Sequence, residues 1–498
     1  MMQIPHNTPL PTQFNMAAHV LARADDDPSK IALSVLGQED WTYRDLERAI
    51  RGIGTGLLQG GLRPGDRALM RLGNTPAFPM TYLACIAVGL VPVPTSSQLT
   101  GPEISKIAAE IKPALIIADT GITLPDHSAP VLSAQALTEF HHAPPCDWDL
   151  GDPNRPAYII YTSGTSGQPR AVVHAHRAVW ARRMMIDGWY GLRPDDRLLH
   201  AGAFNWTYTL GTGLMDPWAI GATALIPPAG TSAQDLPKML SDHQATIFAA
   251  APGVYRQMLR AQMPSLPQLR HGLSAGEKLP DGLRAQWTAL TGTEIYEAYG
   301  MSECSTFVSA SPSRPAPPGT LGYPQQGRQI ALIADNGPAD YGVIAVHRSD
   351  PGLMLGYLDR PEETAAKFSG DWFLTGDVAS RQPGGALRYE GRNDDMMNAG
   401  GYRVSPVEVE EAMTTYPGLT EAAAVELTVK AETTVIALFY CAQSDLPESD
   451  LIAHASSRLA RYKCPRLFLR VPQLPRGANN KLLRRALRQT WEAEHGQT

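Results

Sequence analysis

Short apolar runs alternate with segments of helical periodicity over most of the chain. The runs at residues 67–72, 114–119 and 156–161 are typical of buried strands, whereas residues 41–59 carry apolar side chains at the spacing of an amphipathic helix. Such alternation is typical of α/β architecture. The pattern therefore predicts a large domain built of β-sheets that helices cover.

The pattern changes after residues 391–401. Residues 404–416 predict a capped helix, residues 435–442 a strand and residues 448–462 a further helix. A segment of roughly a hundred residues with this α+β pattern is long enough to form a separate small domain. The chain of 498 residues also exceeds what one compact core usually holds. We therefore expect an N-terminal domain over residues 1–392 and a C-terminal domain over residues 393–498.

Composition narrows the class of protein. Hydrophobic residues make up 43% of the chain and charged residues 18%, which is typical of a globular protein. The net charge of −6, with basic residues scattered along the chain, argues against nucleic acid as a partner. The five cysteines form no CxxC pair, and the most apolar stretch, residues 83–93, is too short to span a membrane. We expect a cytoplasmic protein without a membrane partner. Whether it forms a homodimer is left open.

A loop rich in Ser, Thr and Gly follows the predicted strand at residues 156–161. Its hydroxyls and backbone N–H groups, with little side-chain bulk, could wrap phosphate oxygens. The loop is not a Walker A motif, because no Gly-Lys-Ser/Thr follows at the required spacing, and taken alone such a run is more often a plain turn. The loop comprises Thr162, Ser163, Gly164, Thr165, Ser166 and Gly167.

Four further residues are candidates for the same chemistry. Glu303 could hold Mg²⁺ while phosphates complete its coordination shell. Asp377 could accept hydrogen bonds from ribose hydroxyls, and Arg392 could add a ribose or phosphate contact. Lys481 is a point charge suited to a developing negative charge on transferring oxygens. Each of these residues, taken singly, is more often an ordinary surface group.

The order of the motifs is more specific than any one of them. Together they closely resemble the adenylate-forming (AMP-binding) superfamily of acyl-CoA synthetases, luciferases and adenylation domains. The resemblance covers most of the chain, through YTSGTSGQPR at 161–170, LSAGEKLP at 273–280, YGMSE at 299–303, WFLTGD at 372–377, YEGRNDD at 389–395 and LPRGANNK at 474–481.

The resemblance implies a fold and an activity. Members of this family have a large N-terminal domain of helix-covered sheets with a distorted β-barrel subdomain, and a small mobile α+β lid. With ATP and Mg²⁺ they convert a carboxylate to an acyl-adenylate and diphosphate. A thiol, usually that of coenzyme A, then displaces AMP. The chain is expected to be an AMP-forming acyl-CoA synthetase whose partners are a small carboxylic acid, ATP and CoA.

The resemblance also implies site residues. Lys481, Thr165 and Glu303 are the expected catalytic residues, with Glu303 as the metal ligand. Asp394 is the expected hinge of the lid, and Gly400, Gly401 and Arg403 are expected to line the path of CoA. The nucleotide is expected to contact Thr162, Ser163, Gly164, Thr165, Gly276, Glu277, Glu297, Ala298, Tyr299, Gly300, Met301, Ser302, Asp377, Arg392 and Lys481.

The segment at residues 200–214 falls where the family places its acyl pocket. Amino-acid-activating relatives carry Phe-Asp here, whereas this chain has Phe204-Asn205, and a neutral amide cannot neutralise a substrate ammonium group. We therefore favour an aromatic acid, with short or medium aliphatic acids as the next choice. The expected pocket is lined by Phe204, Asn205, Trp206, Tyr208, Ala275, Gly276 and Gly300.

Several positions depart from the family pattern. Arg170 replaces a frequent Lys, Asn398 a frequent Lys, and Asn480 the Gly before the lysine. Two alternatives therefore stay open: an aryl-adenylating enzyme that loads a carrier protein, and a nucleotide-binding homologue without catalysis. The nearby His174 and His176 lack the third ligand of a zinc site, and we expect both to be solvated.

Overall fold

The computed structural model describes residues 8–162, 169–335, 337–399, 402–430, 433–459, 461–477 and 482–495, and the side chains of residues 398, 399, 402, 403, 430 and 433 are not part of that description. The described chain divides into two compact units. The first comprises residues 1–330 and 346–371, and the second comprises residues 331–345 and 372–498.

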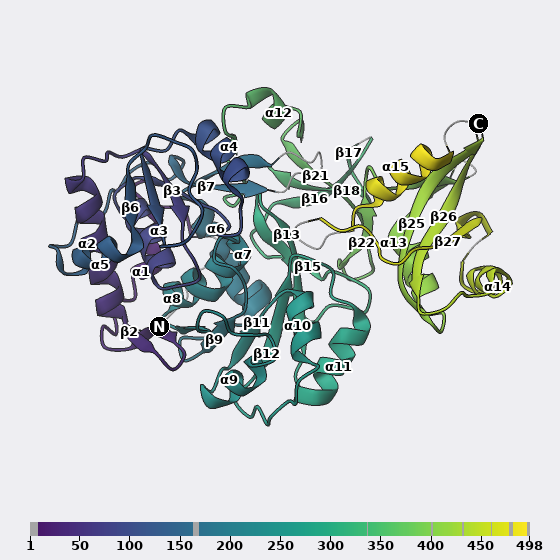
Figure 1. Ribbon diagram of the computed structural model, residues 1–498, viewed down its shortest axis with the longest axis horizontal. Coiled ribbons are helices and arrows are strands. Elements are labelled where there is room, and N and C mark those ends of the chain that lie inside the picture. The colour runs from purple at the N-terminus through teal and green to yellow at the C-terminus, as the bar shows by residue number, and fades with distance from the viewer. Residues whose placement is uncertain are drawn as a thin grey trace. The chain divides into compact units, whose positions relative to one another are not determined.

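A nine-stranded sheet forms the centre of the first unit (Figure 1). Its inner strands run parallel, and the strands at its two edges are antiparallel. In spatial order the strands are β15 (Tyr323–Pro324), β14 (Ser305–Ser309), β13 (Ile295–Met301), β12 (His271–Ala275), β11 (Ile247–Ala249), β9 (Arg197–His200), β10 (Thr223–Ile226), β1 (Ile31–Val35) and β2 (Glu39–Thr42).

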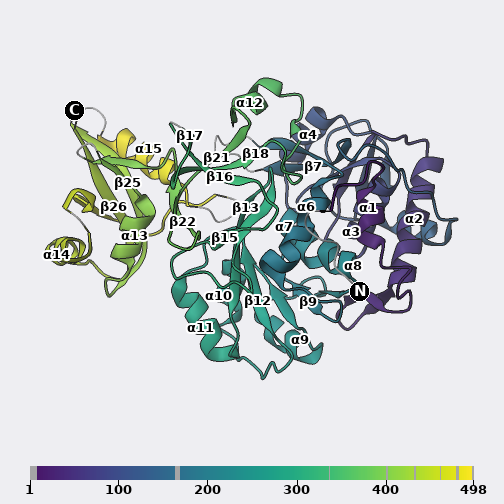
Figure 2. The same cartoon turned by 180° about the vertical axis from the view of Figure 1, so that it is seen from behind.

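Both faces of this sheet are covered, as a parallel sheet requires. On one face Leu199 and Phe248 pack against Tyr255 and Trp287 of the helices α10 and α11. On the other face Leu198 and Ala275 belong to a second apolar cluster. Figures 1 and 2 show α10 and α11 beside β12 from both sides. The helices of this half of the unit are α6 (Ala178–Met185), η2 (Ile186–Tyr190), α7 (Thr207–Leu210), η3 (Gly211–Met215), α8 (Asp216–Ile220), α9 (Leu236–Asp242), α10 (Pro252–Met258) and α11 (Asp281–Thr291).

Two smaller sheets complete the first unit. One is parallel, in the order β4 (Val91–Pro94), β3 (Arg67–Arg71), β5 (Leu115–Ala118) and β6 (Val131–Ser133). The other is antiparallel, in the order β19 (Gly356–Tyr357), β8 (Arg170–Ala175) and β7 (Pro156–Thr162). The accompanying helices are α1 (Met16–Leu21), α2 (Tyr43–Gln59), α3 (Ala77–Ala87), α4 (Gly101–Ile111), α5 (Ala134–Glu139), η1 (Phe140–His142) and α12 (Pro361–Ala365).

Side-chain caps fix where several helices begin. The Thr42 hydroxyl accepts a hydrogen bond from the Asp45 N–H at 3.1 Å and starts α2. Thr100 and Glu103 form a capping box at α4. In the second unit, the Ser405 hydroxyl accepts a hydrogen bond from the Glu408 N–H and starts α13 (Pro406–Thr414). These caps lie where the sequence pattern changes to helical spacing.

The second unit contains a three-stranded sheet and its helices. The sheet runs in the order β25 (Leu419–Lys430), β26 (Thr433–Ala442) and β27 (Leu467–Arg470), and it packs with α13 (Pro406–Thr414), α14 (Glu448–Arg458) and α15 (Arg484–His495). The remaining elements of the described chain, of which β20 belongs to the first unit, are β16 (Ile330–Ala334), β17 (Gly337–Pro338), β18 (Tyr341–His347), β20 (Phe368–Ser369), β21 (Trp372–Arg381), β22 (Leu387–Arg392), β23 (Met397–Ala399), β24 (Tyr402–Val404) and η4 (Arg461–Lys463).

The predicted α/β class, with a C-terminal domain of strands and helices, is confirmed. The barrel subdomain and the boundary at residues 392 and 393 stay predictions. By compactness, residues 331–345 and 372–392 group with the C-terminal segment. Among the described residues, no helix has the length and apolar character needed to cross a membrane.

Candidate active site

The predicted phosphate loop joins two paired strands of the first unit. β7 ends at Thr162 and β8 begins at Arg170, and these two residues lie opposite each other in the antiparallel ladder. The ends of the loop are therefore held side by side by strand pairing. Ser163, Gly164 and Thr165 lie outside the described residues, so their roles stay predictions.

Glu303 lies in the turn that joins β13 to β14, and three contacts hold this turn. The Tyr357 hydroxyl donates to Glu303 Oε1 at 2.8 Å, and the Met354 N–H donates to the Glu303 carbonyl at 2.8 Å. His174 Nε2 lies 2.7 Å from the Ser302 carbonyl. Since His174 belongs to β8, the turn that carries Glu303 is tied directly to a strand that flanks the phosphate loop.

Glu303 suits a hard divalent cation. Its carboxylate is only 8% exposed, and its Oε2 has no hydrogen bond among the described residues. Carboxylate oxygens are the ligands that Mg²⁺ prefers, usually one or two of them together with substrate phosphates. Within the described part of the chain, no group of three or more His, Cys, Asp or Glu could hold a metal ion. Glu303 would thus act as a single protein carboxylate.

Strand β13 carries the predicted wall of the nucleotide site. It pairs in parallel with β12, so that Ala298 lies opposite Ala275. Gly300 has no room for a side chain, because a Cβ there would lie 2.2 Å from the Ser305 carbonyl oxygen. Gly276, just after β12, has φ +95°, a conformation that glycine adopts readily. The glycine at 300 is therefore required by the pairing of β13 with β14, and the contacts of these wall residues with a ligand stay predictions.

Glu297, a predicted nucleotide contact, is engaged within the protein. Its carboxylate accepts from the Leu279 N–H at 3.0 Å and lies 3.2 Å from the Arg284 guanidinium. Burial raises the pKa of Glu297 to about 7, although the Leu279 hydrogen bond and Arg284 act in the opposite direction. Its side chain therefore supports the local structure, and direct contact with a ligand stays a prediction.

The three predicted aromatic walls of the acyl pocket lie in different surroundings. Phe204 is 2% exposed and packs edge-to-face on Phe78, whereas Trp206 is 40% exposed. Tyr208 packs on the sheet, where its hydroxyl donates to the Leu273 carbonyl at 3.2 Å. No ring contact joins the three aromatics in the described residues. Their place in one acyl pocket stays a prediction.

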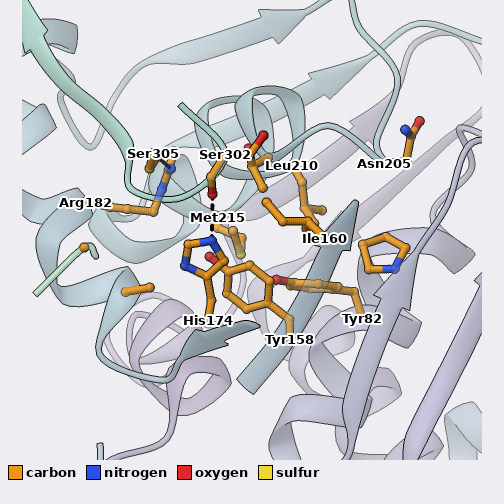
Figure 3. A pocket seen from close by; sticks show the side chains of 14 residues that line it. Tyr82, Tyr158, Ile160, His174, Arg182, Asn205, Leu210, Met215, Ser302 and Ser305 are labelled. Atoms are coloured by element: carbon orange, nitrogen blue, oxygen red, sulfur yellow. Dashed lines mark hydrogen bonds between the residues drawn. The ribbon is translucent and has the colours of Figure 1, made fainter. Parts of the chain in front are cut away.

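Asn205 lines a small cavity of about 20 Å³ (Figure 3), which is room for about one water molecule. His174 stacks on Tyr158 there, with ring centroids 4.8 Å apart. Our expectation that His174 and His176 are solvated is wrong, since their exposed fractions are 2% and 0%. Burial lowers the pKa of His174 to about 4 and that of His176 to about 3, so both imidazoles are neutral at physiological pH.

A buried ion pair lies beside this cavity, and nothing in the sequence indicated it. Arg182 Nε donates to Asp216 Oδ1 at 2.8 Å, and a second guanidinium nitrogen lies 2.5 Å from Oδ2. Tyr190 and Ser305 make further hydrogen bonds to this pair. The satisfied network fixes α6, η2 and α8 relative to one another.

The second unit holds the predicted ribose contacts. Asp377 of β21 lies opposite Arg392 of β22, and their side chains approach to 3.6 Å. The Tyr389 hydroxyl donates to Asp377 at 3.1 Å, and Arg392 also pairs with the predicted hinge residue Asp394 at 3.1 Å. The structure thus brings the two predicted ribose contacts together and places the predicted hinge residue beside Arg392. Tyr389 opens the segment at residues 389–395 that the sequence singled out, but no role was assigned to it there.

The predicted CoA segment and catalytic lysine are described only in part. β23 and β24 form an antiparallel pair in which Asn398 lies opposite Arg403. Gly400, Gly401 and Lys481 lie outside the described residues, as does the side chain of Arg403. Their roles stay predictions.

Comparison with known proteins adds independent evidence. The family model for AMP-binding enzymes matches residues 20–358, and the model for the AMP-binding enzyme C-terminal domain matches residues 408–481. The chain is 28% identical to a 3-hydroxybenzoate–CoA ligase from Aromatoleum sp. (strain CIB), covering 92% of this chain and 93% of that protein. It is also 28% identical to a benzoate–CoA ligase from Thauera aromatica, over 97% and 98% of the two chains. The structure of a benzoate CoA ligase from Burkholderia xenovorans LB400 superposes with a TM-score of 0.82 at 27% identity, covering 95% of this chain and 100% of that chain.

Proposed function

Because the chain belongs to the family of AMP-binding enzymes, we propose that it activates a carboxylic acid with ATP and then transfers the acyl group to coenzyme A. The observation that carries this proposal is the hydrogen bond from His174 to the Ser302 carbonyl. It joins the turn that carries Glu303 to a strand that flanks the phosphate loop, within a single compact unit. The family predicted from the motif order agrees with both family models.

The proposed reaction has two steps. In the first, a carboxylate oxygen of the acid attacks the α-phosphorus of ATP, the bond to the bridging oxygen breaks, and diphosphate leaves. In the second, the thiolate sulfur of CoA attacks the acyl carbon, and the bond to the AMP oxygen breaks. Because negative charge develops on the transferring group in the first step, the reaction needs cations and N–H donors arranged beforehand.

We assign the first step to residues of both units. The loop from Thr162 to Thr165 would bind the leaving phosphates, and Glu303 would hold Mg²⁺, whose charge offsets that of the phosphates when it is bound. Asp377 and Arg392 would bind the ribose. Lys481 would approach the α-phosphate and the substrate carboxylate, and Asp394 would be the hinge that moves the lid between the two steps.

An aromatic acid is the favoured substrate. The relatives above act on benzoate and 3-hydroxybenzoate, and Asn205, one of the residues that line the small cavity, carries a neutral amide rather than a carboxylate. A human relative that is 28% identical over 96% of this chain is an acyl-coenzyme A synthetase, so aliphatic acids belong in the test. Mg²⁺ dependence, a cytoplasmic location and the oligomeric state are parts of the proposal to be measured separately.

One screen tests the proposal. Benzoate, 3-hydroxybenzoate, butyrate and octanoate are supplied with ATP and Mg²⁺, and exchange of labelled diphosphate into ATP is followed. Thioester formation is then measured with free CoA and with a holo carrier protein. Acid-dependent exchange followed by saturable CoA thioester formation is expected. No exchange with any acid would support the homologue without catalysis, and thioester formation with the carrier protein alone would support the loading enzyme.

A further inference from the structure

Tyr357 is held rigidly beside the phosphate-loop strand. It lies on β19, which pairs antiparallel with β8, and its own Cα partner is Val172. The Tyr357 N–H also donates to the Thr364 hydroxyl at 3.0 Å. The side chain is only 5% exposed. Backbone pairing on one side and the Thr364 contact on the other leave this tyrosine little freedom.

The Tyr357 hydroxyl determines how the Glu303 carboxylate is turned. It donates to Oε1 at 2.8 Å in a buried setting, where a hydrogen bond to an ionised group is strong. Oε1 is thereby directed toward the tyrosine. Oε2 has no hydrogen bond among the described residues, so it is the oxygen left for a cation.

Arg170 holds the tyrosine from the other side. Its guanidinium carbon lies 5.3 Å from the centre of the Tyr357 ring, and its Nε donates to Glu363 Oε2 at 2.8 Å. Arg170 is the first residue of β8, directly after the phosphate-loop segment. The guanidinium is therefore engaged with Tyr357 and Glu363, and its link to Glu303 runs through the tyrosine.

We propose that Tyr357 is a positioning residue that orients the Glu303 carboxylate toward the magnesium ion of a bound nucleotide, and that Arg170 supports this orientation through Tyr357. The inference rests on the proposed function, because it takes Glu303 as the ligand of Mg²⁺. It goes beyond that function by giving roles to two residues that need not touch substrate or metal.

The experiment compares nucleotide binding with and without the metal. ATP affinity of the full-length protein is measured by calorimetry in EDTA and in excess Mg²⁺, for the wild type and for Tyr357→Phe. The variant is expected to bind ATP in EDTA as the wild type does. The factor by which Mg²⁺ tightens ATP binding should fall about tenfold or more, as is usual for the loss of one hydrogen bond to a charged group. The Mg²⁺ concentration at half-maximal diphosphate exchange should rise by a similar factor, and saturating Mg²⁺ should restore most of the rate.

The chain offers a matched control. The Tyr161 hydroxyl donates to Glu110 at the same distance of 2.8 Å on the strand before the loop, without contacting Glu303. Tyr161→Phe should leave the Mg²⁺ dependence within about twofold of the wild type. Arg170→Lys should shift it less than Arg170→Gln, since lysine keeps the charge but loses the fork geometry.

Two results would overturn the inference. One is an unchanged Mg²⁺ effect on ATP affinity in a folded Tyr357→Phe protein, and the other is a wild type whose ATP affinity Mg²⁺ does not change. Should Tyr357→Phe fail to fold, Arg170→Gln takes its place. A change of at least about twofold in the Mg²⁺ dependence supports the inference, and an unchanged Mg²⁺ dependence overturns it. Absence of acid-dependent exchange in the wild type would refute the proposed function instead, while the binding measurement would still report on Tyr357.

Discussion

Glu297→Gln should change how the stability of the first unit depends on pH. The carboxylate of Glu297 is buried, and its pKa in the folded protein is raised to about 7 from an ordinary value of 4.5. Ionisation is therefore easier in the unfolded chain. The contribution of Glu297 to the free energy of unfolding is fully present below pH 4.5. It is lost as the pH rises toward 7. Glutamine keeps an oxygen that can accept from the Leu279 N–H but cannot ionise.

The size of the effect follows from the shift. At 1.36 kcal/mol for each pKa unit, the ionised form costs about 3 kcal/mol of stability at pH 8, as an order of magnitude. The unfolding entropy is about 2.1 cal/mol/K per residue, and the first unit comprises residues 1–330 and 346–371. Dividing the free energy by the unfolding entropy of this unit gives a change in Tm of about 4 °C. Part of this loss has already occurred at pH 5, so relative to the wild type Glu297→Gln should gain about 3 °C in Tm between pH 5 and pH 8.

The measurement is the difference in Tm between variant and wild type at pH 5, 6, 7 and 8. The difference matters, because the buried histidines His174 and His176 act in the opposite sense: their lowered pKa values remove stability as the pH falls below 6.5. Both proteins share that contribution, so it cancels. Glu294→Gln, at an exposed carboxylate three residues earlier, is the control and should give a flat difference. A Glu297→Gln difference that does not vary with pH would refute the reasoning.

Three further predictions concern the lid and the core. Lys481→Ala should reduce adenylation, measured by diphosphate exchange, by at least about a hundredfold, because one positive charge at the transferring group is lost. Thioester formation from supplied acyl-adenylate should stay nearly intact. Equal loss of both steps would contradict separate roles for the lid. Asp394→Pro should leave adenylation nearly intact and slow thioester formation, since proline restricts the backbone motion that a hinge needs. A normal rate of thioester formation from supplied acyl-adenylate would show that Asp394 is not the hinge. Asp216→Ala should lower the free energy of unfolding, measured by chemical denaturation, by roughly 3–5 kcal/mol, because it leaves Arg182 charged and unpaired in the core. A loss below about 1 kcal/mol would show that the ion pair contributes little.

The sequence predicted the elements well where the pattern was long and regular. The helix expected over residues 41–59 is α2 (Tyr43–Gln59), and the strand expected over 156–161 is β7 (Pro156–Thr162). These assignments succeed because local periodicity records which face is buried. The grouping of β21 and β22 with the C-terminal segment could not be predicted in this way, since compactness depends on contacts between distant residues.

The candidate site was predictable where a motif carried it and otherwise was not. Asp377 and Arg392 came from motifs, and strand pairing places them opposite each other. Tyr357 lies outside every quoted motif, and Tyr389 lies in one but was given no role. Their partners, Glu303 and Asp377, lie 54 and 12 positions away in the sequence. The solvated state expected for His174 was wrong because the sequence around it does not show that Tyr158 and the Ser302 carbonyl enclose its ring.

The neutrality of the two imidazoles beside the loop has a consequence for nucleotide affinity. Because their pKa values are about 4 and about 3, these two residues gain no charge between pH 5 and pH 8. Electrostatic attraction from this side is then constant across mild acidification. A change in ATP binding over that range would therefore originate in other groups, such as the buried carboxyl of Glu297, with its pKa of about 7, or the terminal phosphate of the ligand, which by analogy with phosphate monoesters has a pKa of about 6.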